Sequence, residues 1–449
     1  MAKGMNIIRY NPIFWLQKEG FWAILAVLTV LAIPSLLIES PMYIPCGVAI
    51  IIGLSFLWYF PESSIALLIN GVIYISVILN VFGLQAGQWV TLLYMTAFVF
   101  ACFIIWLKEP KFPNWQVWAR ILMLPLLIGM LMFISLLGSE SPEYGSTKFF
   151  RYGTYQLAAI IGLIMVLTSR KRLRTLFIWI VLFGALIVFT SILTQRSEFG
   201  IFKRLTLSED VNPIGFARNI GFGAITLLFF WDEEGKIWRN ILIAIGLIIG
   251  LLFIILSGSR GPFLGYIAGL LAFLAIVSKK PQRFILMTFG LVALVLILLK
   301  LLPIELWLSR VSSVVANVSI VQRLTLWKQA IKLIGTHPVM GSGLGSFDAY
   351  IGYGVRWPHN IFLEIWSEIG ILGIIIFLIF IFKGLRLGWL YRSDKDHFVR
   401  NVSCVGFAMA VFSLVISQFS GDLSFNFLIW FSISLLISLP FIPRENDSE

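Results

Sequence analysis

The sequence predicts an all-α, polytopic integral membrane protein with about 14 transmembrane helices and one long loop subdomain on the outer face. Composition and hydropathy carry this prediction. Of the 449 residues, 59% are hydrophobic and only 12% are charged, whereas soluble domains carry roughly 25% charged residues. The mean hydropathy is +0.94. Runs of about 20 apolar residues, enough to cross a bilayer, recur along the whole chain and leave no room for a separate soluble domain.

The predicted spans follow the apolar runs in order, and short polar connections separate them. They cover residues 21–38, 44–60, 62–83, 89–107, 119–138, 148–168, 175–193, 212–231, 240–257, 261–278, 283–302, 361–382, 402–420 and 423–441. No cleavable signal peptide is expected, because the first apolar run begins after about twenty mixed residues and many more follow it.

Basic residues predict the orientation of these spans. With fourteen spans, the lysine- and arginine-rich loops at 108–120, 170–174, 279–283 and 383–400 all fall on the same side as the N-terminus. Cytoplasmic loops carry an excess of lysine and arginine, so this side is predicted to be cytoplasmic and both termini lie there. The net charge of +12 therefore indicates cytoplasmic loops, and no nucleic-acid partner is predicted.

The three cysteines, Cys46, Cys102 and Cys404, fall inside apolar spans. Cysteines in such positions are typical small core residues, and no disulfide set is expected. The chain contains no histidine and cysteine cluster with zinc spacing. No metal site and no cofactor are predicted.

The loop at 303–360 is the longest on the outer face, and long loops are usually functional. Within it, residues 321–334 predict an amphipathic helix with Leu324, Trp327, Ile331 and Ile334 on one face. Three glycines follow at positions 341, 343 and 345. They resemble a phosphate-binding loop only weakly, because no strand precedes them. A tight turn against the membrane surface is the simpler interpretation.

Arginines on the outer face are the first candidates for a binding site. Arg260 lies at a junction between two spans, Arg218 lies about two turns inside a span, and Arg323 begins the loop helix. An arginine at membrane depth costs several kcal/mol unless it faces a partner or a water-filled cavity. Guanidinium groups bind phosphate oxygens in a bidentate way, so converging arginines indicate a diphosphate site. Lys328 and Arg356 are weaker candidates for the same site.

His359 is the candidate catalytic residue. It directly precedes a predicted span and follows Trp357 and Pro358, which places it at the outer edge of the membrane. A neutral imidazole can take a proton from a hydroxyl as a general base. The alternative is a structural hydrogen-bonding role, which the neighbouring Asn360 favours because asparagine is a good helix N-cap.

Three stretches of the chain together resemble the O-antigen ligase and O-antigen polymerase family of membrane glycosyltransferases. The first is Ser259-Arg260-Gly261. The second runs from Arg323 through the glycine triplet at 341–345, and the third runs from His359-Asn360 to Gly373. The resemblance covers residues 205–380. It suggests three regions: N-terminal transmembrane helices at 1–204, a catalytic region at 205–383 and C-terminal transmembrane helices at 384–449.

The resemblance implies a reaction and a location. The donor would be an oligosaccharide linked to polyprenyl diphosphate, such as undecaprenyl diphosphate, and Arg260, Arg323 and Arg218 would bind its diphosphate. His359 would activate a hydroxyl of a glycan or glycolipid acceptor, and transfer would invert the anomeric centre without a metal. The protein would lie in the bacterial cytoplasmic membrane with its active site on the outer face.

Other classes of membrane protein remain alternatives. A flippase of lipid-linked oligosaccharides would show internal repeats and charged residues near the midplane of the membrane, and the sequence shows no clear repeat. A peptidoglycan polymerase would rely on an acid in a large outer loop, where Asp348 is the single candidate. An oligosaccharyltransferase would need a large first outer loop, which is predicted to contain only residues 39–43.

Overall fold

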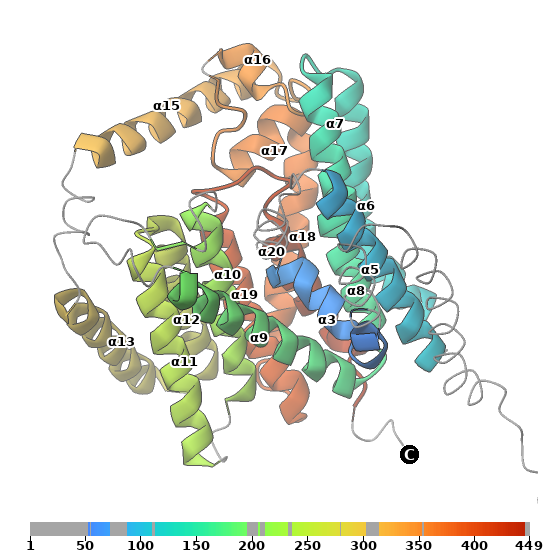
Figure 1. Cartoon of the computed structure of the whole chain (residues 1–449). Coiled ribbons are helices and arrows are strands. Elements are labelled where there is room, and N and C mark those ends of the chain that lie inside the picture. The colour runs from blue at the N-terminus through green and yellow to red at the C-terminus, as the bar shows by residue number, and fades with distance from the viewer. Residues whose placement is uncertain are drawn as a thin grey trace, which may run out of the picture.

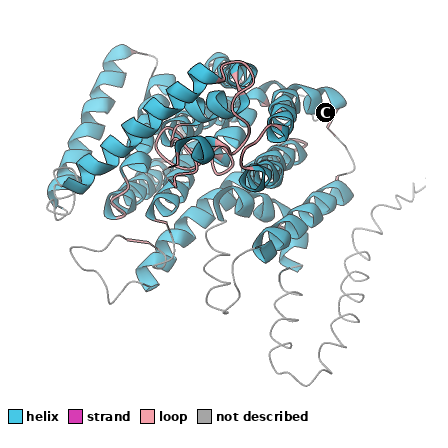
Figure 2. Cartoon of the chain, turned by 90° about the horizontal axis from the view of Figure 1, so that it is seen from above, coloured by secondary structure: helices cyan, strands magenta, loops and turns pink. Residues whose placement is uncertain are grey.

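Helices and their connecting loops make up all of the chain that the structure, a computed structural model, describes (Figure 2). The described residues are 53, 55–71, 88–109, 113–194, 205–206, 212–231, 236–278, 280–301, 314–352 and 354–444. Figure 1 shows the α-helices α3 Pro61–Ala66, α5 Gln88–Lys108, α6 Trp115–Leu137, α7 Pro142–Arg151, α8 Ala158–Val166, α9 Arg170–Thr194, α10 Pro213–Thr226, α11 Ile237–Leu256, α12 Arg260–Val277, α13 Pro281–Leu301, α15 Val314–Thr336, α16 Phe347–Ile351, α17 Ile361–Ile369, α18 Ile371–Tyr391, α19 His397–Ile416 and α20 Phe427–Ile437.

The predicted all-α, polytopic fold is confirmed. Within the described ranges, nine helices are long and apolar enough to cross a membrane, and two shorter apolar helices cover Tyr94–Lys108 and Phe427–Ile437. The predicted span at 21–38 lies outside the described residues, as do parts of those at 44–60 and 62–83. The predicted number of fourteen is therefore not confirmed. The span predicted at 148–168 begins earlier, because its helical path starts at Pro142.

Gly370 divides the span that was predicted at 361–382. The backbone of Gly370 has φ of +87°, a conformation that glycine adopts at little cost. A Cβ there would lie 2.1 Å from the carbonyl oxygen of Val339. The prediction of one continuous helix was wrong: α17 ends at this break, and α18 is the helix that is long enough to cross the membrane.

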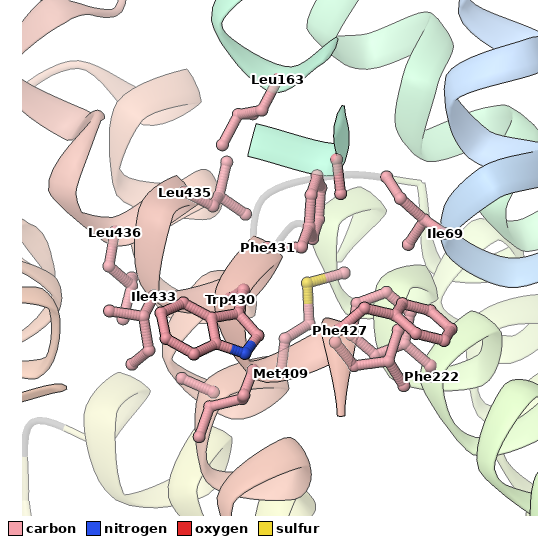
Figure 3. Packing of buried hydrophobic residues seen from close by; sticks show 14 of the residues in the cluster. Ile69, Leu163, Phe222, Met409, Phe427, Trp430, Phe431, Ile433, Leu435 and Leu436 are labelled. Carbon is pink, nitrogen blue, oxygen red and sulfur yellow. The ribbon is translucent and has the colours of Figure 1, made fainter. Parts of the chain in front are cut away.

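The core of the bundle lies around α19, α20 and the helices that flank them. Figure 3 shows Trp430 and Phe431 of α20 among buried aliphatic and aromatic side chains. Both rings are fully buried, and the Trp430 ring stacks on Phe380 with 5.3 Å between ring centroids. Close approach of α12 to α19 depends on glycine, because a Cβ at Gly265 would lie 2.7 Å from the side chain of Ile416. Small residues at such contacts are typical of membrane helix pairs.

Helix α15 lies across the upper end of the bundle in Figure 1, next to α16 and above α17. Its buried side chains are Leu326, Ala330 and Leu333, which pack with Phe347 of α16. The prediction of its apolar face was wrong in part, since Leu324 and Ile331 are 49% and 58% exposed. The helix carries two apolar stripes at helical spacing, and packing against α16 and α17 selects the second one.

Candidate active site

The glycine triplet forms a tight turn that is hydrogen-bonded to α17. Gly341, Gly343 and Gly345 all have positive φ, from +73° to +98°. The amide of Gly343 donates to the carbonyl of Glu368 at 3.2 Å, and the amide of Gly345 donates to Oε2 of the same residue at 2.9 Å. The tight-turn prediction is confirmed, but the turn packs on α17 and on the α6–α7 connection: a Cβ at Gly343 would meet Gly138 at 2.6 Å.

Helix α17 begins at Ile361, directly after His359, the predicted catalytic residue, and Asn360. The side chain of Asn360 accepts hydrogen bonds from the amides of Phe362 and Leu363 at 3.0 and 3.1 Å, so its predicted N-cap role is confirmed. The amide of Ile361 donates to the carbonyl of Ser417 at 3.1 Å. These contacts tie the start of α17 to the end of α19.

His359 has an unusual backbone and a defined side-chain partner. Its φ is +58°, and among the described residues no other non-glycine residue has a positive φ. Strain of this kind concentrates at functional sites. The indole Nε1–H of Trp357 donates to Nδ1 of His359 at 3.0 Å. Because an indole N–H can only donate, the neutral imidazole holds its own proton on Nε2.

Arg260, Arg323 and His359 are brought together from three separate elements. Burial and, to a smaller extent, the positive charge of Arg323 together lower the pKa of His359 to about 4. Burial also lowers the pKa of Arg323, and the nearby charge of Arg260 adds to that shift. The loop histidine therefore stays neutral near physiological pH, beside Arg323, which in turn lies near Arg260. This group is the predicted constellation of two arginines and one histidine.

Arg218 of α10 contacts a different part of the same end of the bundle. Its guanidinium donates to the carbonyl of Phe425 at 3.1 Å and lies 5.3 Å from the ring centroid of Phe427. Its Nε is buried and has no hydrogen-bond partner among the described residues. Arg218 thus borders residues 417–427, the connection between α19 and α20, which also contacts α17 through Ser417.

The two weaker candidates lie in other surroundings. Lys328 is exposed on α15. Arg356 lies over the ring of Tyr144, 5.0 Å from its centroid. Arg356 also lines a polar cavity of about 490 Å³ whose other lining residues include Glu140, Glu143 and Asp348. Carboxylates repel a diphosphate, so the cavity suits hydroxyl groups better than the donor headgroup.

The structure also contains a buried ionic cluster that the sequence analysis did not predict. Lys148 of α7 contacts Glu364 and Glu368 of α17. Two signals could have indicated it: a lysine inside an apolar helix, which is rare without a functional reason, and two glutamates four residues apart on one helix face. The partner of these glutamates could not be identified, because it lies more than 200 residues away.

The fold and the site together define a multi-pass membrane protein that gathers arginines and a histidine at one end of its helical bundle. Residues 245–378 match the family model described as O-Antigen ligase. This match to about a third of the chain supports the resemblance to the O-antigen ligase and polymerase family that the three sequence stretches indicate. This family implies a membrane glycosyltransferase of the ligase or polymerase type. A comparison with curated proteins gives no match.

The matched segment runs from α11 into α18 and contains Arg260, Arg323 and His359. Arg218 and Lys148 lie before it, and the 417–427 connection lies after it. The three-residue constellation thus comes from the part of the chain that the family defines. The contacts made by Arg218, Lys148 and the 417–427 connection come from parts of the chain outside the matched segment.

Proposed function

We propose that this protein transfers a glycan from a polyprenyl-diphosphate donor to an acceptor hydroxyl at the outer face of the membrane. The observation that carries the proposal is that Arg260 lies close enough to Arg323, and Arg323 close enough to His359, for each charge to lower the pKa of its neighbour. Two cations that keep their charge at any relevant pH suit a diphosphate, and a neutral imidazole beside them suits an acceptor hydroxyl.

In the proposed reaction Arg260 and Arg323 bind the diphosphate of the donor. The bond between the anomeric carbon and the diphosphate oxygen breaks, and its electron pair leaves with the diphosphate. Fixed positive charges stabilise the charge that develops on this leaving group. Arg218, with one unpaired buried nitrogen, is proposed as a further ligand of the donor. Lys328 and Arg356 stay predictions of the sequence.

His359 is proposed as the general base for the acceptor hydroxyl. Without substrate, burial and Arg323 hold its pKa near 4, which makes it a weak base. A bound diphosphate brings negative charge beside the imidazole and raises that pKa towards the working pH. The acceptor hydroxyl would take the place of the Trp357 indole at Nδ1 and give up its proton there. Attack from the face opposite the leaving group inverts the anomeric centre, and this sequence of steps assigns no role to a metal.

The test is a transfer assay with the purified full chain in liposomes, a polyprenyl-diphosphate oligosaccharide, an acceptor glycan and EDTA. Release of polyprenyl diphosphate is compared between wild type and His359→Asn, because asparagine tolerates the left-handed backbone at this position. We expect EDTA-resistant release in the wild type and a loss on the order of 100-fold or more in the variant. His337→Asn, a loop histidine on the same face, is the matched control and should keep full activity.

The products separate the remaining possibilities. A ladder of glycan sizes indicates a polymerase, and a single transfer indicates a ligase. Full activity of His359→Asn would remove the general-base role. Movement of the lipid-linked sugar across the liposome membrane, with no release of polyprenyl diphosphate, would replace the transferase by the flippase.

A further inference from the structure

Lys148 is a charged residue in the interior of a membrane bundle. It lies one turn from the end of α7, in the helical path Pro142–Val166 that is apolar enough to cross a membrane. Its side chain is 0% exposed. The ammonium donates to Oε1 of Glu364 at 2.5 Å and to Oε2 of Glu368 at 2.6 Å. Both carboxylates come from α17 and are equally buried.

Each glutamate also accepts a hydrogen bond from a backbone amide of a loop. Both oxygens of Glu364 accept from the amide of Leu423 at 3.0 Å, in the connection between α19 and α20. Oε2 of Glu368 accepts from the amide of Gly345 at 2.9 Å, in the glycine turn. One ammonium therefore joins α7, α17, the glycine turn and the 417–427 connection.

A second contact from α7 supports the same arrangement. The hydroxyl of Tyr144, one turn before Lys148, donates to Oδ2 of Asp422 at 2.6 Å. Oδ1 of Asp422 accepts from the amide of Phe425 at 2.9 Å, and the carbonyl of Phe425 accepts from Arg218. The cluster thus reaches one of the proposed ligands of the donor.

Lys148 supplies positive charge to a cluster that holds more carboxylates than ammonium groups. Three buried carboxylates, Glu364, Glu368 and Asp422, surround one ammonium, and Oε1 of Glu368 has no hydrogen-bond partner in the described part of the chain. Burial raises the pKa of both glutamates, and Lys148 opposes that shift. Removing one partner of a buried ion pair leaves an uncompensated charge. Lys148 is therefore needed for α17 to dock in this position.

We propose that Lys148 is a positioning residue of the transferase: it fixes α17, and with it His359 two residues before the helix, against Arg260 and Arg323. The proposal rests on the proposed function. Arg260 belongs to α12, which packs on α19, so a displaced α17 moves the base relative to Arg260, whereas Arg323 lies on α15, which packs on α17. Misplacement of a catalytic group by about 1 Å can cost on the order of 100-fold in rate.

The first experiment compares Lys148→Met with wild type and with Lys395→Met, an exposed lysine between α18 and α19. The assay measures kcat and the KM for the polyprenyl-diphosphate donor, and thermal unfolding in detergent is measured in parallel. We expect kcat to fall on the order of 100-fold in Lys148→Met, by a larger factor than the donor KM rises, because α15, which carries Arg323, also packs on α17. Equal kcat in all three proteins would overturn the proposal. A large rise of KM at unchanged kcat would do the same.

A milder variant covers the case in which Lys148→Met does not fold. Glu364→Gln keeps the shape of the side chain and the pair of Lys148 with Glu368. It weakens one of the two bonds to the ammonium, so we expect kcat to fall about tenfold. A folded Glu364→Gln protein with the kcat of wild type would contradict the positioning role.

A readout that needs no transfer keeps this proposal separate from the proposed function. Diethyl pyrocarbonate modifies accessible imidazoles, and mass spectrometry reports each histidine by itself. We expect His359 to react several-fold faster in Lys148→Met or Glu364→Gln than in Lys395→Met, with His337 unchanged. If the wild type transfers no glycan, the proposed function fails and this measurement still tests the placement of His359. Unchanged reactivity of His359 would overturn the positioning role in either case.

Discussion

His359 combines three features at the scale of a single residue: a strained backbone, a partner for Nδ1 and a lowered pKa. Each has a separate physical cause, namely the turn before α17, the Trp357 indole, and burial beside Arg323. Their coincidence on one side chain distinguishes His359 from a histidine that only caps a helix. The sequence predicted this residue from its place before an apolar run, but not its neutral state.

The lowered pKa of His359 predicts an unusual pH profile. An ordinary histidine is protonated below about pH 6.5, whereas His359 in the free protein keeps its lone pair down to about pH 4. Because kcat/KM reports the free enzyme, we expect its acidic limb near pH 4. The measurement is kcat/KM against pH, with donor binding measured over the same range. A limb centred near pH 6.5 in kcat/KM alone would contradict the burial of this imidazole.

The same shift predicts how stability depends on pH. Between about pH 6.5 and about pH 4 the unfolded chain binds a proton at His359 and the folded protein does not. The stabilisation of the folded state that comes from the lowered pKa of His359 is fully present above pH 6.5 and is lost as the pH falls towards 4. Thermal unfolding of wild type and His359→Asn should converge as the pH is lowered through this window.

Trp357 provides a test of which imidazole nitrogen acts. If the base is Nδ1, the indole competes with the acceptor hydroxyl, so Trp357→Phe should keep or raise kcat. Phenylalanine retains an aromatic ring and removes the N–H donor. The measurement is single-turnover release of polyprenyl diphosphate, with Trp366→Phe as the control, since Trp366 donates only to the carbonyl of Pro338. A tenfold loss in Trp357→Phe would instead assign the catalytic contact to the Nε2–H group.

At the scale of the element, tertiary packing decides which face of α15 is buried. Its sequence offers two apolar stripes, and the stripe of Leu326, Ala330 and Leu333 is buried because Phe347 and the start of α17 lie beneath it. Arg323, one turn before Leu326, reaches the site through this packing. If Arg323 binds the donor as proposed, the docking of α15 is a condition for that binding.

This packing predicts different effects for two leucines on α15. Leu326 is 6% exposed and Leu324 is 49% exposed. Leu326→Ala should destabilise the docked helix by about 2–5 kcal/mol and raise the KM for the donor, whereas Leu324→Ala should leave both close to wild type. Hydrogen exchange across α15 and donor KM are the measurements. Equal effects of the two substitutions would mean that the outer stripe is the docked one.

At the scale of the whole molecule, the site elements gather at one end of the bundle. Figure 1 shows α15, α16 and the upper ends of α7 and α17 together. Polar loops of this kind cannot lie within the hydrocarbon layer. The positive-inside prediction assigns the opposite end to the cytoplasm, and the site would then face outward.

Thiol labelling tests this orientation. Lys332→Cys on α15 and Lys395→Cys between α18 and α19 are exposed positions, introduced after Cys46, Cys102 and Cys404 are replaced by alanine. We expect a membrane-impermeant maleimide to label Lys332→Cys in intact spheroplasts and Lys395→Cys only after the membrane is opened. The reverse pattern would place the site in the cytoplasm.

The sequence by itself predicted the class of the protein and the position of most helices, and it singled out Arg260, Arg323 and His359 as candidate site residues. Apolar run length, glycine, proline and basic loops act locally, so they can be read along the chain. The family match supports the resemblance that these residues carry.

The tertiary structure alone decided the break at Gly370, the buried face of α15 and the Lys148 cluster. Each of these depends on a partner that is distant in the chain: Lys148 is separated from Glu364 by 216 residues. Burial of a charge is tolerated only where its counter-charge is in place. No local pattern around Lys148 identifies that counter-charge, because the packing of α7 against α17 creates the pair.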